Sequence, residues 1–210
     1  MKKLFFISLL LLIVLSVGQI ALANPKVDLS VLYSDASYAH KTSFGFSITP
    51  HANYRLTDRL SLDGSLSFSW GKGDSSDDVE TRIVLDTVIT AAFDVYTFGT
   101  LSISAKAGIM GLYLKDKMDD GTTEREFFVG AGPGFTTIRY YHPKIKAIFD
   151  AILAFGISSS GFSVGFRLFP SLIYEINSSI EVGLIGGILF VDMDSTFVRL
   201  NIGVNVGYTF

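Results

Sequence analysis

The chain has 210 residues, no cysteine and a formal net charge of −3 at pH 7, and 49% of its residues are hydrophobic. A charge so close to neutral provides no basic field for nucleic acid, and the lack of cysteine excludes a lipid-anchored lipoprotein, a disulfide scaffold and a thiolate metal site. The hydrophobic residues of the chain beyond its first 23 residues are dispersed, so none of its stretches reaches the roughly 20 apolar residues of a membrane-spanning helix.

The first 23 residues have the pattern of a secretory signal peptide. Two lysines precede an apolar run from Leu4 to Val17, and the small residues Ala21 and Ala23 stand two apart. We therefore expect cleavage after residue 23 and a single mature domain over residues 24–210. The alternative interpretation, an N-terminal membrane helix, would need a longer apolar span and no cleavage site.

Ten stretches of the remaining chain carry apolar residues at every second position, which is the period of a strand with one apolar face. In chain order they cover residues 27–33, 44–56, 60–70, 83–95, 101–113, 127–141, 145–155, 162–174, 180–190 and 198–210. The sixth stretch is the least regular, because Pro133 interrupts it. The pattern predicts an all-β chain of ten antiparallel strands, and the loss of one hairpin would leave eight as the alternative.

The connections between these stretches alternate in character. Every odd-numbered stretch is followed by a mostly longer and acidic segment, namely 35–42, 71–78, 116–124, 158–161 and 192–195. Every even-numbered stretch is followed by a short turn. This asymmetry is expected of an up-and-down outer-membrane barrel, with loops outside the cell and with the turns and both termini in the periplasm.

Aromatic residues mark both ends of the predicted strands. The expected periplasmic belt is Tyr54, Tyr96, Tyr141, Tyr174 and Tyr208, and the expected outer belt is Tyr33, Trp70, Tyr113, Phe155 and Phe190. Ten residue steps at about 3.3 Å and a tilt near 40° span roughly 25 Å, the height of a lipid-facing band. Aromatic side chains with a polar edge favour the membrane interface, so these belts predict a transmembrane barrel.

Charged residues within the stretches have the parity opposite to the apolar face, except Lys115 and Arg139, which lie near strand ends where long side chains can reach lipid head groups. The set that we expect to line the lumen is Asp63, Arg82, Asp86, Lys106, Asp150, Arg167, Glu181 and Arg199. A Lys or Arg facing lipid near the midplane would cost about 2 to 4 kcal/mol, so a bilayer demands this sorting. A soluble sandwich or lipocalin-like barrel would show the same alternation, but it would need neither the belts nor the loop asymmetry.

The final segment, NIGVNVGYTF, has Val206, Tyr208 and Phe210 on its apolar face. It looks like the signal that the barrel assembly machinery reads, and the chain resembles small bacterial outer-membrane β-barrel proteins as a superfamily. The resemblance implies a monomer in the outer membrane of a Gram-negative bacterium, with outer-membrane lipid and lipopolysaccharide as its surroundings. It implies no particular activity.

The strongest hypothesis for catalysis places His40 near Asp192 and Asp194, because the first and last strands must pair to close a barrel. His40 would then act as a base toward water at the extracellular rim, as in a hydrolase. We expect no enzyme instead, since the chain has no Asp-x-His motif of the omptin-like proteases. His51 and His142 do not fit the His and Ser pair of a lipid A deacylase either.

Two acidic clusters are candidate cation sites, because carboxylate oxygens suit Ca²⁺ and Mg²⁺. We expect solvated loop tips there, and therefore no metal and no cofactor; the clusters are Asp74, Asp77, Asp78 and Asp116, Asp119, Asp120.

The lumen is the remaining place for a function. Ten strands enclose little more than the eight whose side chains fill their own interior, and buried charges persist when they are paired. We therefore predict a structural or interaction scaffold with a filled or very narrow polar lumen. The alternative is a small porin-like channel for small solutes or hydrophobic ligands.

Overall fold

The structure, a computed structural model, describes residues 25–74 and 78–210. The predicted signal peptide, residues 1–23, lies outside the described residues. No helix among the described residues is long and apolar enough to cross a membrane.

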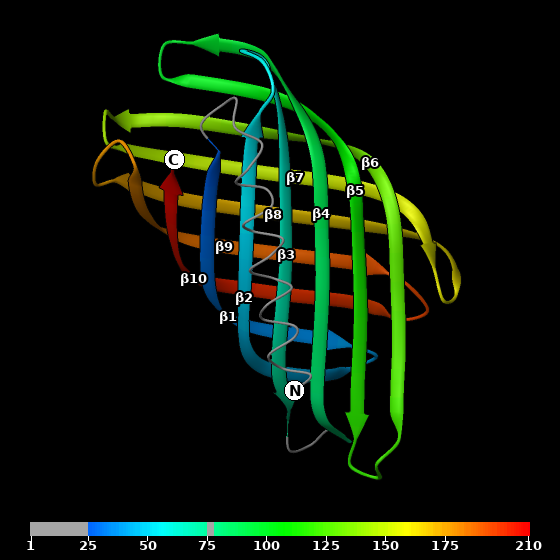
Figure 1. The fold of residues 1–210 in the computed structure, drawn as a ribbon. Helices are drawn as coiled ribbons and strands as arrows, with labels where there is room; N and C mark the ends of the chain where they lie inside the picture. Colours follow the sequence, from blue (N-terminus) through cyan, green and yellow to red (C-terminus); the bar gives the residue numbers. More distant parts are fainter. Residues whose placement is uncertain (1–24, 75–77) are drawn as a thin grey trace.

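The described chain forms a closed antiparallel barrel (Figure 1). Each strand pairs with its neighbours in sequence, and β1 pairs with β10 to close the sheet. The prediction of ten strands is therefore confirmed and the eight-strand alternative is wrong. The strands are β1 (Lys26–Tyr38), β2 (Lys41–Arg55), β3 (Leu60–Gly73), β4 (Val79–Phe98), β5 (Leu101–Met118), β6 (Thr123–His142), β7 (Ile145–Ser158), β8 (Gly161–Glu175), β9 (Ile180–Asp192) and β10 (Thr196–Thr209).

Proline interrupts three strands without ending them. Pro133 in β6 is paired with β5, but the ladder from β6 to β7 skips from Ala131 to Gly134. Pro50 in β2 and Pro170 in β8 lie at the same kind of gap in the ladder to the following strand. Because proline has no N–H to donate, it fits only where the ladder lacks that bond. This arrangement explains how the irregular sixth stretch still forms a full strand.

We call the two ends of the barrel the terminal end and the loop end. The terminal end holds the start of β1, the end of β10 and the connections 56–59, 99–100, 143–144 and 176–179, and the loop end holds the end of β3, the start of β4 and the connections 39–40, 119–122, 159–160 and 193–195. The prediction of longer loops at one end is wrong. Most residues of the polar segments that were predicted as loops belong to the strands instead. The hydrogen bonds between neighbouring strands join backbone groups, so polar side chains do not prevent them. Ala39 and His40, for example, form a two-residue turn with φ of 51° and 64°, as a tight hairpin requires.

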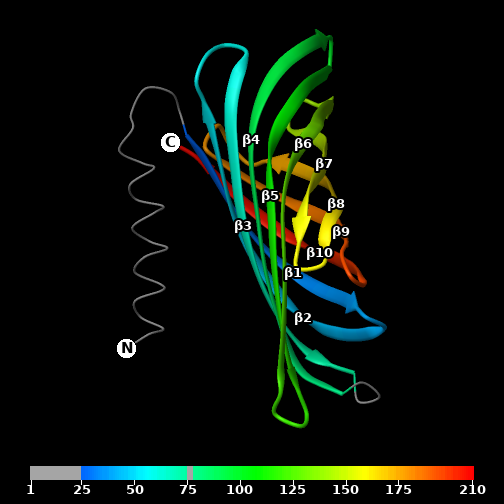
Figure 2. The same ribbon diagram turned by 90° about the vertical axis from the view of Figure 1, so that its right-hand side faces the viewer.

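Strand length, rather than loop length, makes the barrel uneven. β4 and β6 have 20 residues each and β5 has 18, whereas β1 and β9 have 13. The hairpin of β5 and β6 therefore projects beyond its neighbours at the loop end (Figure 2).

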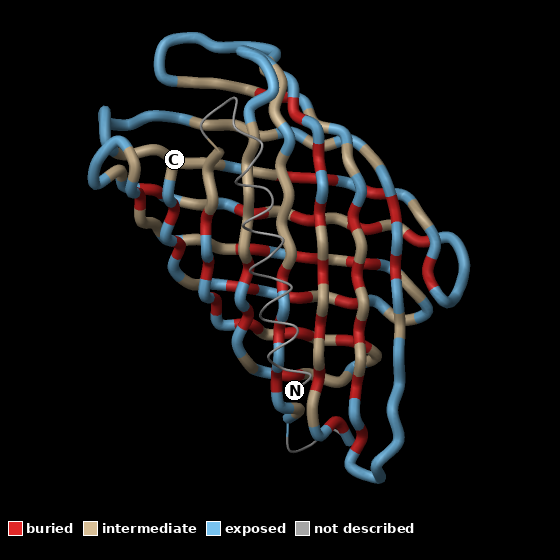
Figure 3. Tube along the Cα trace, in the orientation of Figure 1, coloured by how far each residue is buried: buried red, intermediate tan, exposed pale blue. Residues whose placement is uncertain are grey.

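The barrel has its apolar face outside and its charges inside. Large apolar side chains such as Phe46, Leu184 and Ile202 are more than 60% exposed, while Arg82 and Arg199 are at most 1% exposed. Burial alternates along many of the strands (Figure 3). A water-soluble barrel with a dry centre would have the reverse distribution, so this pattern agrees with the predicted transmembrane barrel.

The predicted belt residues lie on the outer face of the strands, and none of them is buried. Tyr33 contacts Phe46 edge-on at a centroid distance of 6.4 Å, and the backbone of Phe46 pairs in turn with that of Trp70. That these residues meet the membrane interfaces stays a prediction.

Candidate functional site in the barrel lumen

The half of the lumen next to the loop end is filled by a closely packed apolar cluster. Phe128 is fully buried there, and the inward-facing Gly165 opposite it leaves room for its ring. A Cβ added at Gly165 would lie 2.0 Å from Cε of Met110 and 2.8 Å from Cε1 of Phe128. We call this cluster the plug: Ala36, Tyr38, Val84, Val88, Met110, Leu112, Leu114, Phe128, Ile152, Ala154, Leu189, Val191 and Phe197.

Two buried ion pairs complete the filling of this half. Arg199 pairs with Asp86 and donates a second hydrogen bond to the Ser69 hydroxyl at 2.9 Å. Arg82 binds Asp116 through two parallel hydrogen bonds, from Nε to Oδ1 at 2.8 Å and from Nη2 to Oδ2 at 2.7 Å. Such a fork is the strongest geometry available to an arginine and a carboxylate.

The position of Asp116 corrects the sequence interpretation. We expected it at a solvated loop tip, but it is only 1% exposed, because β5 continues to Met118 and turns residue 116 into the lumen. Asp116 and the inward-facing Lys106 both lie on β5 and both have even residue numbers. The alternation of side chains along the strand would therefore have been enough to predict that Asp116 faces the lumen. Asp77 of the other acidic cluster lies outside the described residues.

The half of the lumen next to the terminal end contains a cavity of about 530 Å³. Its lining reaches Arg55, Arg59 and Thr97, which are exposed at the terminal end, so the cavity opens there. Five cations and five carboxylates line it: Lys26, Arg55, Arg59, Lys106, Arg167, Asp28, Asp63, Asp94, Asp150 and Glu181.

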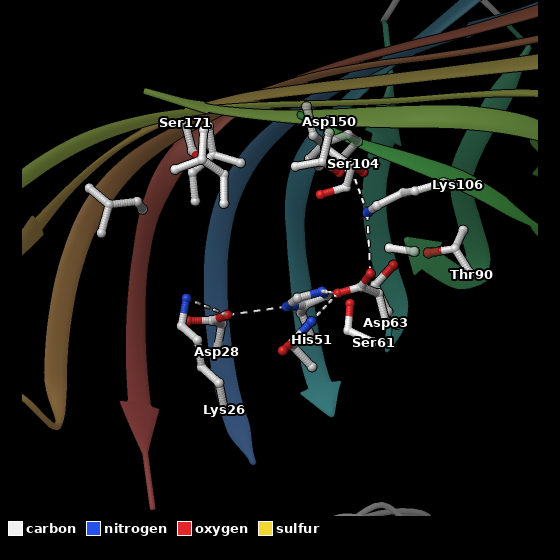
Figure 4. A pocket seen from close by; sticks show the side chains of 18 of the residues that line it. Lys26, Asp28, His51, Ser61, Asp63, Thr90, Ser104, Lys106, Asp150 and Ser171 are labelled. Carbon is white, nitrogen blue, oxygen red and sulfur yellow. Dashed lines mark hydrogen bonds and ion pairs between the residues drawn. The ribbon is translucent and has the colours of Figure 1, made fainter. Parts of the chain in front are cut away.

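A chain of polar contacts crosses one wall of the cavity (Figure 4). His51 Nδ1 lies 3.1 Å from Asp28 Oδ2, and His51 Nε2 lies 3.9 Å from Asp63. Lys106 then connects Asp63, at 3.4 Å, with Asp150, at 2.6 Å. The chain therefore runs from β1 through β2, β3 and β5 to β7.

A second group of ion pairs continues this wall in the other direction. Lys26 pairs with Asp28 at 3.3 Å and also with Glu181. Lys146 in turn binds Glu181 at 3.0 Å and Glu175 at 2.7 Å. Charges of the two signs thus neutralise one another along most of the lining.

Arg167 differs from the other cations of the cavity. It is 7% exposed, its Nη1 donates to the Ser65 hydroxyl at 2.7 Å, and its guanidinium lies 4.1 Å from the centre of the Phe169 ring. No carboxylate of the described chain lies within ion-pair distance of it, and its buried Nε has no hydrogen-bond partner.

The wall around Arg167 carries a group of apolar side chains among polar ones. From the strands β6 to β9, the lining has the apolar residues Ile138, Ile148, Phe169, Ile173 and Ile185 and the polar residues Thr136, Tyr140, Asp150, Ser171 and Glu181. Asp150 and Glu181 are bound by lysines, so the five apolar residues, called the apolar wall below, adjoin one buried cation that has no ion pair among the described residues.

Comparisons with known proteins agree with the geometry. No family model matches the sequence, and no curated protein matches it. Among solved structures, the outer membrane protease OmpT from Escherichia coli is 11% identical with a TM-score of 0.61, over 89% of this chain and 97% of that chain. The COG4313 outer membrane channel from Pseudomonas putida F1 is 12% identical with a TM-score of 0.53, over 90% of this chain and 96% of that chain.

The chain has the outer-membrane β-barrel fold. One similar structure is a protease and the other a channel, so this fold does not indicate which activity an outer-membrane barrel has.

The eight predicted lumen charges of this outer-membrane barrel all have inward-facing positions, but their partners partly differ from expectation. Asp86 pairs with Arg199, and Asp63 and Asp150 share Lys106. Arg82 uses Asp116, and Glu181 uses Lys26 and Lys146, three partners that were not in the predicted set. Arg167 lacks the carboxylate expected for it.

The residues proposed for a rim hydrolase are not joined. His40 occupies the turn between β1 and β2, and no hydrogen bond or ion pair between described residues connects it to Asp192 or Asp194. His142 accepts a hydrogen bond from the backbone N–H of Lys144 at 3.3 Å, which stabilises the turn between β6 and β7.

The predicted assembly-signal residues lie on the outer side of the barrel. Val206 and Tyr208 are exposed on β10, and the Tyr208 ring meets Phe210 edge-on at a centroid distance of 4.8 Å. Their recognition by another protein stays a prediction.

Proposed function

We propose that this protein is a monomeric, non-conducting outer-membrane scaffold whose lumen is closed near the loop end. The observation that carries this proposal is the plug, in which Met110, Phe128 and Leu189 are completely buried. A channel for solutes needs a continuous wet path, and buried apolar side chains packed together provide none. The Arg199–Asp86 and Arg82–Asp116 pairs occupy the same half of the lumen.

In this proposal, lipid and lipopolysaccharide surround the exposed apolar face, and the terminal end, with the cavity, faces the periplasm. The barrel assembly machinery would recognise β10 through Val206, Tyr208 and Phe210. We propose a structural or binding role rather than catalysis, because most of the charges that line the cavity are paired with opposite charges and, among the described residues, no hydrogen bond or ion pair joins His40 to Asp192 or Asp194.

The decisive experiment is conductance of the refolded protein in a planar lipid bilayer. We expect no stepwise current from the wild type. The triple variant Met110→Ala, Phe128→Ala, Phe197→Ala removes three side chains of the plug, and its currents would show that inserted barrels are detectable. Steps from the wild type itself would reject the closed lumen and support the porin-like alternative instead.

The orientation of the barrel in the membrane can be tested by labelling single introduced cysteines, because the chain contains no cysteine of its own. Ser159 at the loop end and Ser178 at the terminal end are both exposed. In intact cells, a membrane-impermeant maleimide should label the Ser159→Cys variant and should reach the Ser178→Cys variant only after the outer membrane is permeabilised. The reverse labelling pattern would contradict a periplasmic cavity.

A further inference from the structure

We propose that the cavity at the terminal end binds one anionic amphiphile, whose head group is held by Arg167 and whose alkyl chain lies on the apolar wall. This inference goes beyond the scaffold role, since it assigns a ligand to the space that the plug leaves open.

The argument begins with the burial of Arg167. A buried cation is tolerated when an opposite charge and hydrogen bonds compensate for its lost hydration. Arg167 has the Ser65 hydroxyl and the face of the Phe169 ring, but no ion-paired carboxylate among the described residues. Its donors are thus incompletely satisfied, with Nε both buried and without an acceptor.

The protein's own carboxylates do not fill this gap. The charges of Asp86 and Asp150 act on Arg167, but Asp86 is bound by Arg199, and Asp150 is bound by Lys106 and accepts a hydrogen bond from Thr136. A carboxylate or phosphate oxygen arriving from outside would supply the acceptor, since both groups match the planar fork of a guanidinium.

The position of Arg167 places the head group at the floor of the cavity. Its register partners, Ile152 on β7 and Leu189 on β9, belong to the plug. Ile173 and Ile148 lie further along β8 and β7 toward the terminal end and also line the cavity. An alkyl chain can therefore extend from the floor toward the opening along apolar side chains.

The size of the cavity fits such a ligand. Its volume of about 530 Å³ lies within the range of roughly 300 to 1,000 Å³ that is typical of small-molecule sites. Such sites combine apolar walls with a few polar groups that fix the orientation of the ligand, and the five residues of the apolar wall beside Arg167 offer this combination.

The test measures saturable binding of radiolabelled decanoate to the full barrel in neutral maltoside micelles, with protein-free micelles subtracted. We expect one site per barrel in the wild type and a loss of affinity of roughly tenfold to a hundredfold in Arg167→Gln, the effect of one charged hydrogen-bonding group. The matched control is Arg139→Gln, because Arg139 also lies over an aromatic ring, that of Tyr141, but is exposed on the outer face. Its affinity should stay within about twofold of the wild type.

Equal binding by the wild type and Arg167→Gln would overturn the proposal, and so would the absence of saturable binding to the wild type. Folding of Arg167→Gln is checked by its heat-modifiable migration on gels. If the variant does not fold, a competition series on the wild type tests whether the anionic head group is needed for binding. Decanol should displace decanoate at least tenfold less well than unlabelled decanoate does, and equal displacement by decanol would refute a role for the anionic head.

Decyl phosphate, which has the same number of chain carbons as decanoate, separates two sources of the ligand in the same series. Preference for decanoate would identify a free fatty acid, and preference for the phosphate monoester would identify a lysophosphatidate-like lipid. Failure of binding leaves the conductance result unaffected, so this inference and the closed lumen are tested separately.

Discussion

The buried pair of Arg199 and Asp86 provides the sharpest test of the lumen's energetics. Both side chains are at most 1% exposed, and the Oδ1 atom of Asp86 already lacks a hydrogen-bond partner. Changing Arg199 to Met leaves the carboxylate buried beside the plug without a counter-ion. Breaking a buried pair in this way costs about 3 to 5 kcal/mol, which is a large part of the roughly 5 to 15 kcal/mol that stabilises a typical folded domain.

The double variant Arg199→Met, Asp86→Leu has a different expected outcome. It removes both charges, and its two apolar side chains can extend the plug. Replacing a whole buried pair with apolar residues is often neutral or stabilising. We therefore expect the double variant to recover most of the free energy of unfolding that the single variant loses.

The assay is urea unfolding of the refolded barrel in detergent micelles, followed by the fluorescence of Trp70, which is the only tryptophan of the chain. The control is Lys117→Met, which breaks an ion pair with Glu80 whose side chains are 50% and 47% exposed. That change should cost at most about 1 kcal/mol. A similar small loss in Arg199→Met, or a double variant as unstable as the single one, would refute this account of the lumen.

Three further outcomes follow from packing, membrane exposure and ligand binding. Gly165→Val should lower the free energy of unfolding by about 1 to 3 kcal/mol in the same urea assay, because the new Cβ would overlap Met110; an unchanged midpoint would contradict the close packing of the plug. Leu184→Arg, midway along β9 on the outer face, should cost about 2 to 4 kcal/mol in lipid vesicles, whereas Phe162→Arg at the loop end should cost at most about 1 kcal/mol; equal costs would contradict the placement of the membrane. Decanoate at about 100 times its Kd should stabilise the wild type by about 2.7 kcal/mol and should stabilise Arg167→Gln much less at the same concentration; equal stabilisation would show binding elsewhere.

The number of strands and the face of each side chain could be predicted from the sequence because both depend on a local pattern. A strand alternates its side chains whatever it pairs with, so the parity of Arg82 or Arg199 alone predicts an inward position. The same rule would have placed Asp116 inside. That residue was missed only because acidic neighbours suggested a loop, whereas its hairpin continues through residues 117 and 118.

The division of the lumen into two halves could not be predicted in this way. The position of a side chain along the barrel axis depends on the register between neighbouring strands. Because the strands are staggered, two residues that are equally far in sequence from a turn can lie at different heights along that axis. Arg167 meets Ile152 and Leu189 only through the registers of β7, β8 and β9. The alternation of side chains predicts which residues face the lumen, but it does not predict which of them meet. The pairing of the charges, and the lack of a carboxylate beside Arg167, therefore depend on the three-dimensional arrangement of the strands.

The sequence nevertheless holds a signal for the plug, in the places where alternation stops. In the loop half of β9, Ile188, Leu189, Phe190 and Val191 are apolar on both faces, and β5 does the same from Ile109 to Leu114 with one glycine between. In the terminal half of β1, by contrast, Val27, Asp28, Leu29 and Ser30 alternate strictly. Alternation thus marks a strand with lipid on one side and water or polar side chains on the other, and its loss marks a strand with apolar surroundings on both sides. In a barrel too narrow to hold a separate domain, an apolar inner face must pack against the strands opposite, so the stretches of lost alternation indicate where the lumen closes.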